Sequence, residues 1–308
     1  AIVVIVMQFQ RQTDDEALAR RLFEETKALE LELSRLRREL APAPDQPLPA
    51  AIVQAGKRLQ AMKTRYANLA EERELLGSHR SKEDLLIFRV ARTFGEYDMA
   101  IPDSFVAEVK RYIREWQQSD RLANAVARIN DDNRGRFVAE ALRRQGLPPQ
   151  FIYLAVQESN FRTDAIGPRT RYGIAKGMWQ FIPSTAERYG LKTGPDKGTR
   201  RYDPHDDRFD FERSTWAAAD YLSFLFTTEA QASGLLVMSA YNWGEGNVAR
   251  TLGRFSNDPS KYNFWRLIQS QMIPDETYGY VLRIYAAAVI GEDPALFGFD
   301  FDNPLKGL

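Results

Sequence analysis

Apolar residues recur at helical spacing along most of this chain, and almost no segment alternates as a strand does. Between residues 13 and 40 leucines repeat every seven residues, with two more offset by four, and charged side chains occupy many of the other positions. The leucines are Leu22, Leu29, Leu33, Leu36 and Leu40. This stripe predicts a coiled-coil-like helix over residues 11–40, which would serve either as a stalk or as an arm docked on the rest of the chain.

A proline-rich segment, residues 41–49, follows this helix and has the composition of a semi-rigid linker. Apolar residues at three-, four- and seven-residue steps then predict a second helix. Ser81 is placed to cap a third helix, with Asp84 in its first turn. We therefore expect residues 50–100 to form a helical connecting region.

Helical patterns continue from residue 101 to residue 300, separated by short turns that contain Gly and Pro. The predicted helices are residues 103–118, 120–129, 134–145, 149–158, 183–189, 214–227, 235–242, 264–269 and 275–290. The chain is therefore expected to be all-α, with almost no sheet.

The amino-acid composition excludes several classes of binding and catalytic site. The 308 residues carry no formal net charge, which argues against a general nucleic-acid-binding protein. The absence of cysteine excludes thiolate metal sites, a cysteine nucleophile and disulfides. Only His79 and His205 are present, which argues against a histidine-rich metal site and most Ser–His–Asp arrangements. Acid–base chemistry must then fall mainly to carboxylates, and we expect no cofactor.

Glu158 is the carboxylate with the most informative context. It closes the apolar run 151–157 and precedes an irregular stretch, so it is predicted to lie at the C-terminal end of a buried helix. Burial and the negative end of the helix dipole both raise a carboxyl pKa, which makes Glu158 a candidate proton donor. The Ser159 hydroxyl is placed to hold this carboxyl.

Three later motifs combine aromatic and amide side chains. Residues 177–186 contain Gly177, expected to let the backbone approach a ligand, and Gln180. The other two motifs, residues 240–246 and 276–281, contain Tyr241, Asn242 and Tyr280. Apolar ring faces with amides that bind hydroxyl groups are typical of a sugar-binding site.

These four motifs, in this order, resemble the catalytic domain of the lytic transglycosylases of the soluble-lytic-transglycosylase family, which has a lysozyme-like fold. The Gly-x-Trp-Gln variant at residues 177–180 and the stretch 188–192 are similar to the membrane-bound type D branch. The resemblance covers residues 101–299. It implies that Glu158 is the catalytic acid and base, that Ser159 orients it, and that the remaining residues contact substrate or tune the carboxyl. Those residues are Gln180, Tyr241, Asn242 and Tyr280.

Two departures from the family pattern fall in loops. The spacing between Glu158 and Gln180 is longer than expected, with the extra residues at 167–172, and residues 203–210 also look extended. Closely spaced carboxylates around Asp206 suggest a calcium site, but their spacing fits no metal loop, and Asp210 is better explained as a helix N-cap. We expect no metal.

The resemblance implies a peptidoglycan lytic transglycosylase. Such an enzyme cleaves the MurNAc-β-1,4-GlcNAc bond without water and leaves 1,6-anhydro-MurNAc ends, using one carboxyl where ordinary glycosidases use two. Two alternatives stay open: a muramidase that hydrolyses the same bond, and a catalytically idle glycan-binding scaffold in an envelope complex.

Location and partners follow from the same resemblance. We expect peptidoglycan strands as substrate, no nucleic acid, and a place on the periplasmic side of the bacterial cell envelope. Residues 1–10 begin with seven apolar residues, which are read either as the remnant of a membrane anchor or as a buried strand or helix start. Residues 13–40 could engage a partner helix.

Overall fold

The computed structural model describes most of the chain. The described residues are 49–72, 81–96, 101–228, 230, 233–255, 262–269, 271–307 and, between residues 17 and 40, all but positions 19–20, 23, 27, 31, 34 and 37–38. The predicted anchor, residues 1–10, lies outside these residues, as does most of the predicted linker, residues 41–49. Over the described residues the chain is mainly helical, which confirms the all-α prediction.

The chain forms two compact units, which are described separately. Unit 1 comprises Ala1–Pro102, Phe226–Val237 and Glu245–Met272, and unit 2 comprises Asp103–Leu225, Met238–Gly244 and Ile273–Leu308. The domain boundaries expected from the sequence stay predictions.

Unit 1 contains helices α2 (Ala50–Glu72), α3 (Lys82–Thr93), α11 (Glu245–Leu252) and α12 (Phe264–Gln269), and the first residues of α10 (Gly234–Trp243). Ser81 accepts a hydrogen bond from the Asp84 amide and forms a capping box with it, as predicted. Leu33 is buried with residues of α2, namely Ile52, Ala55 and Leu59, while Leu29 and Leu36 pack at the edge of this cluster. In the described part of residues 17–40, the leucine stripe is therefore docked on α2.

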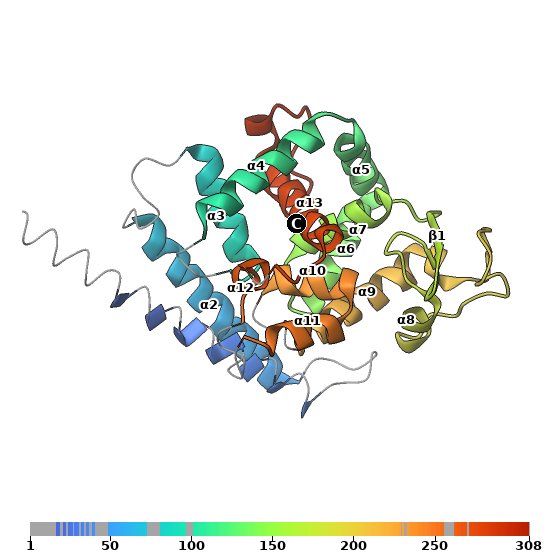
Figure 1. The fold of residues 1–308 in the computed structure, drawn as a ribbon, viewed down its shortest axis with the longest axis horizontal. Coiled ribbons are helices and arrows are strands. Elements are labelled where there is room, and N and C mark those ends of the chain that lie inside the picture. The colour runs from blue at the N-terminus through green and yellow to red at the C-terminus, as the bar shows by residue number, and fades with distance from the viewer. Residues whose placement is uncertain are drawn as a thin grey trace, which may run out of the picture. The chain divides into compact units, whose positions relative to one another are not determined.

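Unit 2 is built around α13 (Asp275–Glu292), a helix that is buried for most of its length. It packs against α4 (Asp103–Gln117) and α7 (Ile152–Ser159), as Figure 1 shows. Trp116 Nε1 donates to the Arg283 carbonyl at 3.0 Å, and the rings of Phe105 and Tyr285 meet edge to face at 5.3 Å. These contacts fix α13, which carries the fourth sequence motif.

Unit 2 contains four further helices and four short 3-10 turns among its described residues. They are α5 (Arg121–Asn130), α6 (Arg134–Arg144), α8 (Pro183–Arg188) and α9 (Phe211–Leu225), with 3-10 turns η1 (Asp131–Asn133), η2 (Pro149–Phe151), η3 (Asp207–Phe209) and η5 (Pro294–Phe297). Asp210 accepts a hydrogen bond from the Arg213 amide at 2.9 Å, which confirms it as the N-cap of α9. Helix α9 thus begins three residues before the predicted start.

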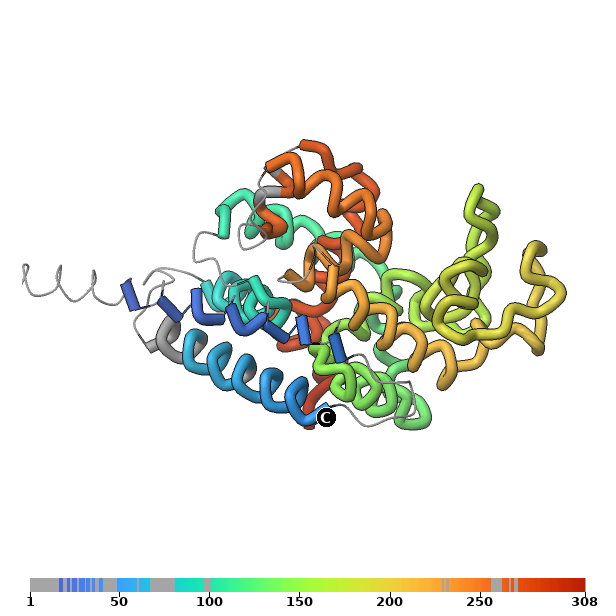
Figure 2. The backbone as a smooth tube through the Cα atoms, turned by 90° about the horizontal axis from the view of Figure 1, so that it is seen from below, coloured from blue at the N-terminus to red at the C-terminus, as the bar shows by residue number. Residues whose placement is uncertain are grey.

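A short antiparallel hairpin interrupts the helices, in the stretch that the sequence left irregular. Strands β1 (Ile166–Thr170) and β2 (Gly173–Lys176) pair with Thr170 opposite Gly173 and Arg169 opposite Ile174. Gly173 has φ of +104°, a conformation that favours glycine. In Figures 1 and 2 the hairpin projects from the helices of unit 2, next to the long loop between α8 and α9.

No helix of the described residues has the length and apolar character needed to cross a membrane.

Candidate active site

Glu158 and Tyr280 meet where α7 and α13 pack together. Tyr280 Oη donates a hydrogen bond to Glu158 Oε1 at 2.5 Å. Glu158 is the penultimate residue of α7, as its position after the apolar run predicts, and Tyr280 lies in the second turn of α13. The resemblance implied this contact, and the packing of the two helices explains it.

The environment of Glu158 favours its neutral form. Burial raises the pKa of this carboxyl to about 7, while the hydrogen bond from Tyr280 acts in the opposite direction. Glu158 nevertheless keeps part of its surface exposed to solvent. Burial also raises the pKa of Tyr280 well above 10, so the phenol stays protonated and can donate its hydrogen bond to the carboxyl.

The helix dipole contributes less than the sequence suggested. Helix α7 has only 8 residues, and Arg121 Nη2 donates to the Gln157 carbonyl at 2.9 Å and to the Val156 carbonyl at 3.4 Å. A cation at these carbonyls offsets the negative end of the helix. Burial is therefore the main cause of the raised pKa of Glu158.

Ser159 makes contacts other than the expected one to the catalytic carboxyl. Its Oγ donates to the Met178 carbonyl at 2.8 Å and to the Ala155 carbonyl at 3.2 Å, and it accepts from the Arg162 amide at 3.0 Å. The hydroxyl thus links the end of α7 to the second motif. Any effect on the orientation of Glu158 acts through the backbone.

Gln180 lies in the turn that follows β2. Its Nε2 donates to the Gly177 carbonyl at 2.7 Å, and its Oε1 lies so close to Gly167 that a Cβ there would be 2.8 Å away. The expectation for Gly177 is corrected. A Cβ at this position would lie 1.7 Å from the Arg208 carbonyl oxygen, so glycine admits this chain's own backbone.

Tyr241 and Asn242 lie near the end of α10. Tyr241 Oη donates to the Trp179 carbonyl at 2.7 Å, which joins the third motif to the second. The charge of Glu158 contributes to raising the pKa of Tyr241, which places the two side chains within electrostatic reach. Asn242 is exposed, and its Oδ1 accepts from Thr277 Oγ1 at 2.8 Å. Among the motif side chains, Tyr280 thus contacts Glu158 directly, and Ser159, Gln180 and Tyr241 bond to backbone carbonyls of the second motif. Asn242 bonds to Thr277 of the fourth motif.

Several supporting residues were not predicted from the sequence. The Trp179 ring is fully buried and donates from Nε1 to Thr215 Oγ1 at 3.2 Å, and Thr277 holds the Asn242 amide. Arg208 is fully buried and donates from Nη1 to the carbonyls of Ile174 and Phe181, at 2.8 and 3.1 Å. Arg208 thereby joins β2 to the residue that follows Gln180. The position of Trp179 beside Gln180 was the only sequence signal for any of these.

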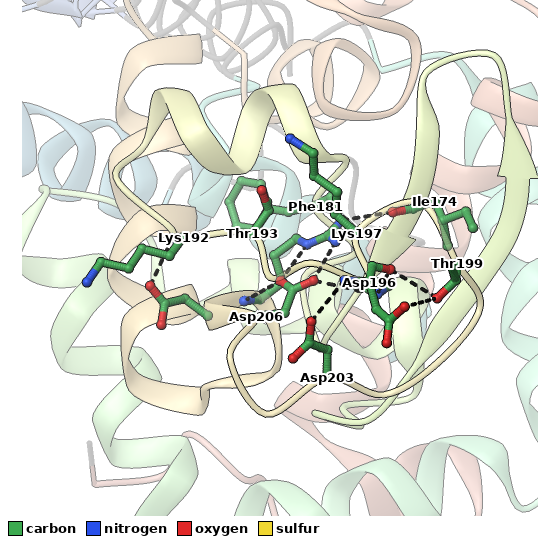
Figure 3. Close-up of polar contacts among 12 residues, drawn as sticks. Ile174, Phe181, Lys192, Thr193, Asp196, Lys197, Thr199, Asp203 and Asp206 are labelled. Atoms are coloured by element: carbon green, nitrogen blue, oxygen red, sulfur yellow. Dashed lines mark hydrogen bonds and ion pairs between the residues drawn. The ribbon is translucent and has the colours of Figure 1, made fainter.

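The carboxylates around Asp206 are held by the protein (Figure 3). Asp206 pairs with Arg208 Nη2 at 2.6 Å and with Lys176 Nζ at 3.6 Å, and all three side chains are fully buried. Asp203 accepts from the backbone amides of His205 and Asp196, which lower its pKa. Within the described residues, no group of three or more His, Asp or Glu side chains could hold a metal ion.

The family described as Transglycosylase SLT domain matches residues 136–264. This part of the chain is therefore similar to a transglycosylase SLT domain. The chain is also 32% identical over 162 residues to the membrane-bound lytic murein transglycosylase D of Escherichia coli strain K12 and to that of strain O6:H1. The type D resemblance is thereby confirmed.

The match covers part of each protein. It includes 53% of this chain and 32% of each relative, so the chain spans about a third of the length of the relatives. Glu158, Gln180, Tyr241 and Asn242 lie inside the matched family region, while Tyr280 lies beyond its end. The hydrogen bond between Tyr280 and Glu158 is therefore evidence of its own for including α13 in the site.

Proposed function

We propose that this chain is a peptidoglycan lytic transglycosylase that cleaves the MurNAc-β-1,4-GlcNAc bond and leaves 1,6-anhydro-MurNAc ends. The observation that carries the proposal is Glu158, a partly exposed carboxyl whose pKa is raised to about 7 and which accepts a hydrogen bond from Tyr280. The transglycosylase domain match gives the same reaction class.

A single carboxyl serves this reaction in two steps. Neutral Glu158 donates its proton to the glycosidic oxygen as that bond breaks, and the substrate's own N-acetyl group stabilises the cation. Ionised Glu158 then accepts the proton of the C6 hydroxyl, whose oxygen closes the anhydro ring. Tyr280 stabilises the ionised form between the steps by donating its hydrogen bond to the carboxylate.

Asp164 is unsuited to act as a second catalytic carboxylate. It forms a bidentate ion pair with Arg162, both contacts at 3.0 Å, and its side chain is largely exposed. The Arg162 contact occupies both carboxylate oxygens and lowers the pKa of Asp164, which makes it a weaker base. A hydrolytic mechanism would need a second group to activate water, which favours the transglycosylase over the muramidase.

We propose that the remaining motif residues bind and align the sugar. The exposed Asn242 amide would bind a substrate polar group, with its orientation fixed by Thr277. Gln180 and Tyr241 would shape the sugar site, since both are tied to the backbone of the second motif. Ser159 would act as a positioning residue through the Met178 carbonyl.

A place in the bacterial cell envelope belongs to the same proposal. The relatives are named membrane-bound murein transglycosylases, which supports an envelope location. Tethering through residues 1–10 and a partner helix for residues 13–40 are further parts of it. Fractionation of cells that express the chain with and without residues 1–10 tests the tether: equal membrane recovery would contradict it.

Mass spectrometry of digested peptidoglycan tests the reaction. Products that carry anhydro-MurNAc ends are expected, and products heavier by one water with reducing ends would identify a muramidase. Replacing Glu158 by Gln keeps the size of the side chain and removes its acid. Unchanged wall degradation by Glu158→Gln would contradict both enzymes and leave the glycan-binding scaffold.

A further inference from the structure

A group of exposed arginines and tyrosines lies in unit 2, outside the catalytic motifs. Arg171 and Tyr172 form the turn of the hairpin, and Tyr172 is 59% exposed. Arg200, Arg201 and Tyr202 lie in the loop between α8 and α9, and Tyr202 is 60% exposed. We call these residues, together with Arg169 of β1, the arginine–tyrosine patch.

A direct contact brings the two parts of the patch together. Arg169 Nη2 donates to the Gly198 carbonyl at 2.9 Å, so the loop lies against the hairpin next to Arg200 and Arg201. Both views of the backbone show the two segments side by side (Figures 1 and 2). Arg171 stacks on the Tyr172 ring with its guanidinium carbon 4.6 Å from the ring centre.

The arginines of the patch form no ion pairs among the described residues. All four of them are exposed. Of the nearby acids, Glu187 pairs with Lys197 and Asp207 pairs with Arg213. Asp196 and Asp203 of the same loop accept hydrogen bonds from Thr199 and from backbone amides. Since the whole chain has no net charge, this local excess is a property of the patch.

Buried contacts connect the patch to the turn that carries Gln180. Lys176 Nζ donates to the Asp196 carbonyl at 2.9 Å, and Arg208 holds the Ile174 and Phe181 carbonyls. These hydrogen bonds connect the loop, the hairpin and the turn of Gln180 to one another (Figure 3). Gly167 of the hairpin also packs directly on the Gln180 side chain.

We propose that the arginine–tyrosine patch binds the carboxylate-bearing peptide stems of the peptidoglycan strand whose glycan lies at Glu158. The proposal rests on the proposed function and names a second part of the same substrate. Arginine guanidinium groups match carboxylates in geometry and charge, and exposed tyrosine rings cover the apolar parts of a peptide. Because Gly167 of the hairpin lies against Gln180, the patch adjoins the place where we propose that the glycan binds.

Binding to the inactive Glu158→Gln protein tests this independently of cleavage. The probes are purified glycan strands with intact peptide stems and the same strands after an amidase has removed the stems. The double variant Arg171→Gln/Arg201→Gln removes two charges from the patch. Arg114→Gln/Arg143→Gln removes two exposed arginines from helices α4 and α6 and serves as the matched control.

The patch variant is expected to weaken binding of stem-bearing strands by roughly three- to ten-fold, because each exposed ion pair contributes modestly. Binding of stem-free strands stays unchanged, as does binding by the control variant. The loss shrinks as salt is raised. In the active protein, the same variant raises KM for stem-bearing strands and leaves kcat unchanged.

Three results would overturn the proposal. If the protein with an unsubstituted patch bound strands with and without stems equally well, the stems would not be bound. An equal loss in the control variant would show a general charge effect. Binding of heparin as tight as that of stem-bearing strands would identify a nonspecific anion surface. Absence of anhydro products would instead contradict the proposed function. The two failures can be told apart, because the binding comparison uses an inactive protein and does not depend on turnover.

Discussion

Tyr280 on α13 donates a hydrogen bond from its hydroxyl group to Glu158 near the end of α7, with 2.5 Å between the two oxygens. This contact is one of two opposing influences on the pKa of the Glu158 carboxyl. Burial raises the pKa of Glu158, and the tyrosine lowers it, leaving a value of about 7. A carboxyl with this pKa can both donate and accept a proton near neutral pH, which a single-carboxyl mechanism requires.

Replacing Tyr280 by Phe is expected to reduce cleavage roughly 10- to 100-fold, the usual effect of losing a hydrogen bond to a charged group. The pKa of Glu158 should rise above about 7, because only the raising influence remains. The descending limb of the pH–rate profile then moves to higher pH, and pH profiles of kcat measure this. Tyr278→Phe, two residues earlier on α13, is the control. A limb that stays in place, or moves to lower pH, would contradict the assignment.

The helices and the catalytic carboxyl could be predicted from the sequence because both depend on local pattern. The apolar run 151–157 fixes a buried helix, and its end fixes Glu158. The hairpin could not, because the two buried positions of its strands hold an isoleucine and a lysine, Ile174 and Lys176, so no alternation of apolar and polar residues marks it. Glycines at its turn and exposed residues along β1 resemble a loop.

The supporting contacts of the site were beyond sequence reasoning for a different reason. Ser159 was expected to hold the neighbouring carboxyl, but it bonds to Met178, which only the fold brings near. Arg208 is a charged residue that local pattern places on the surface. Its burial depends on Asp206 and on backbone carbonyls contributed by two other segments.

Glu158 should make the protein less stable as pH rises. Its pKa in the folded protein, about 7, exceeds the ordinary value of 4.5, so the folded state binds more protons between these values. The stability associated with the neutral carboxyl is complete below pH 4.5 and is lost by about pH 7, to a total of up to about 3 kcal/mol. Glu158→Gln lacks this loss and should exceed the parent protein in Tm at pH 8 by more than at pH 4.5. A Tm difference that does not depend on pH would show that the carboxyl is not perturbed.

Arg208 is expected to stabilise unit 2 far more than an exposed arginine with an equally short ion pair. Arg208→Met breaks a fully buried pair at 2.6 Å, and such losses cost about 3–5 kcal/mol. Arg213→Met breaks a 2.6 Å pair with Asp207 in which the arginine is 62% exposed, so its effect should be much smaller. Urea denaturation of both variants measures the difference. Similar losses from the two would mean that Arg208 does not hold the hairpin and the loop together.

Alanine substitutions at Gly177 and Gly190 distinguish backbone strain from a steric clash. Both residues have φ of +78°, so the backbone strain is the same at the two positions. An alanine Cβ at Gly190 meets no atom within 4 Å, so Gly190→Ala should cost only the conformational strain, about 1 kcal/mol. At Gly177 the same Cβ would lie 1.7 Å from the Arg208 carbonyl oxygen, and the backbone of the second motif must move. Gly177→Ala should therefore lose much more stability and, because Gln180 bonds to the Gly177 carbonyl, most of its activity. Denaturation and cleavage assays compare the two variants. If Gly177→Ala matched Gly190→Ala in both, the close approach of Arg208 would not constrain the site.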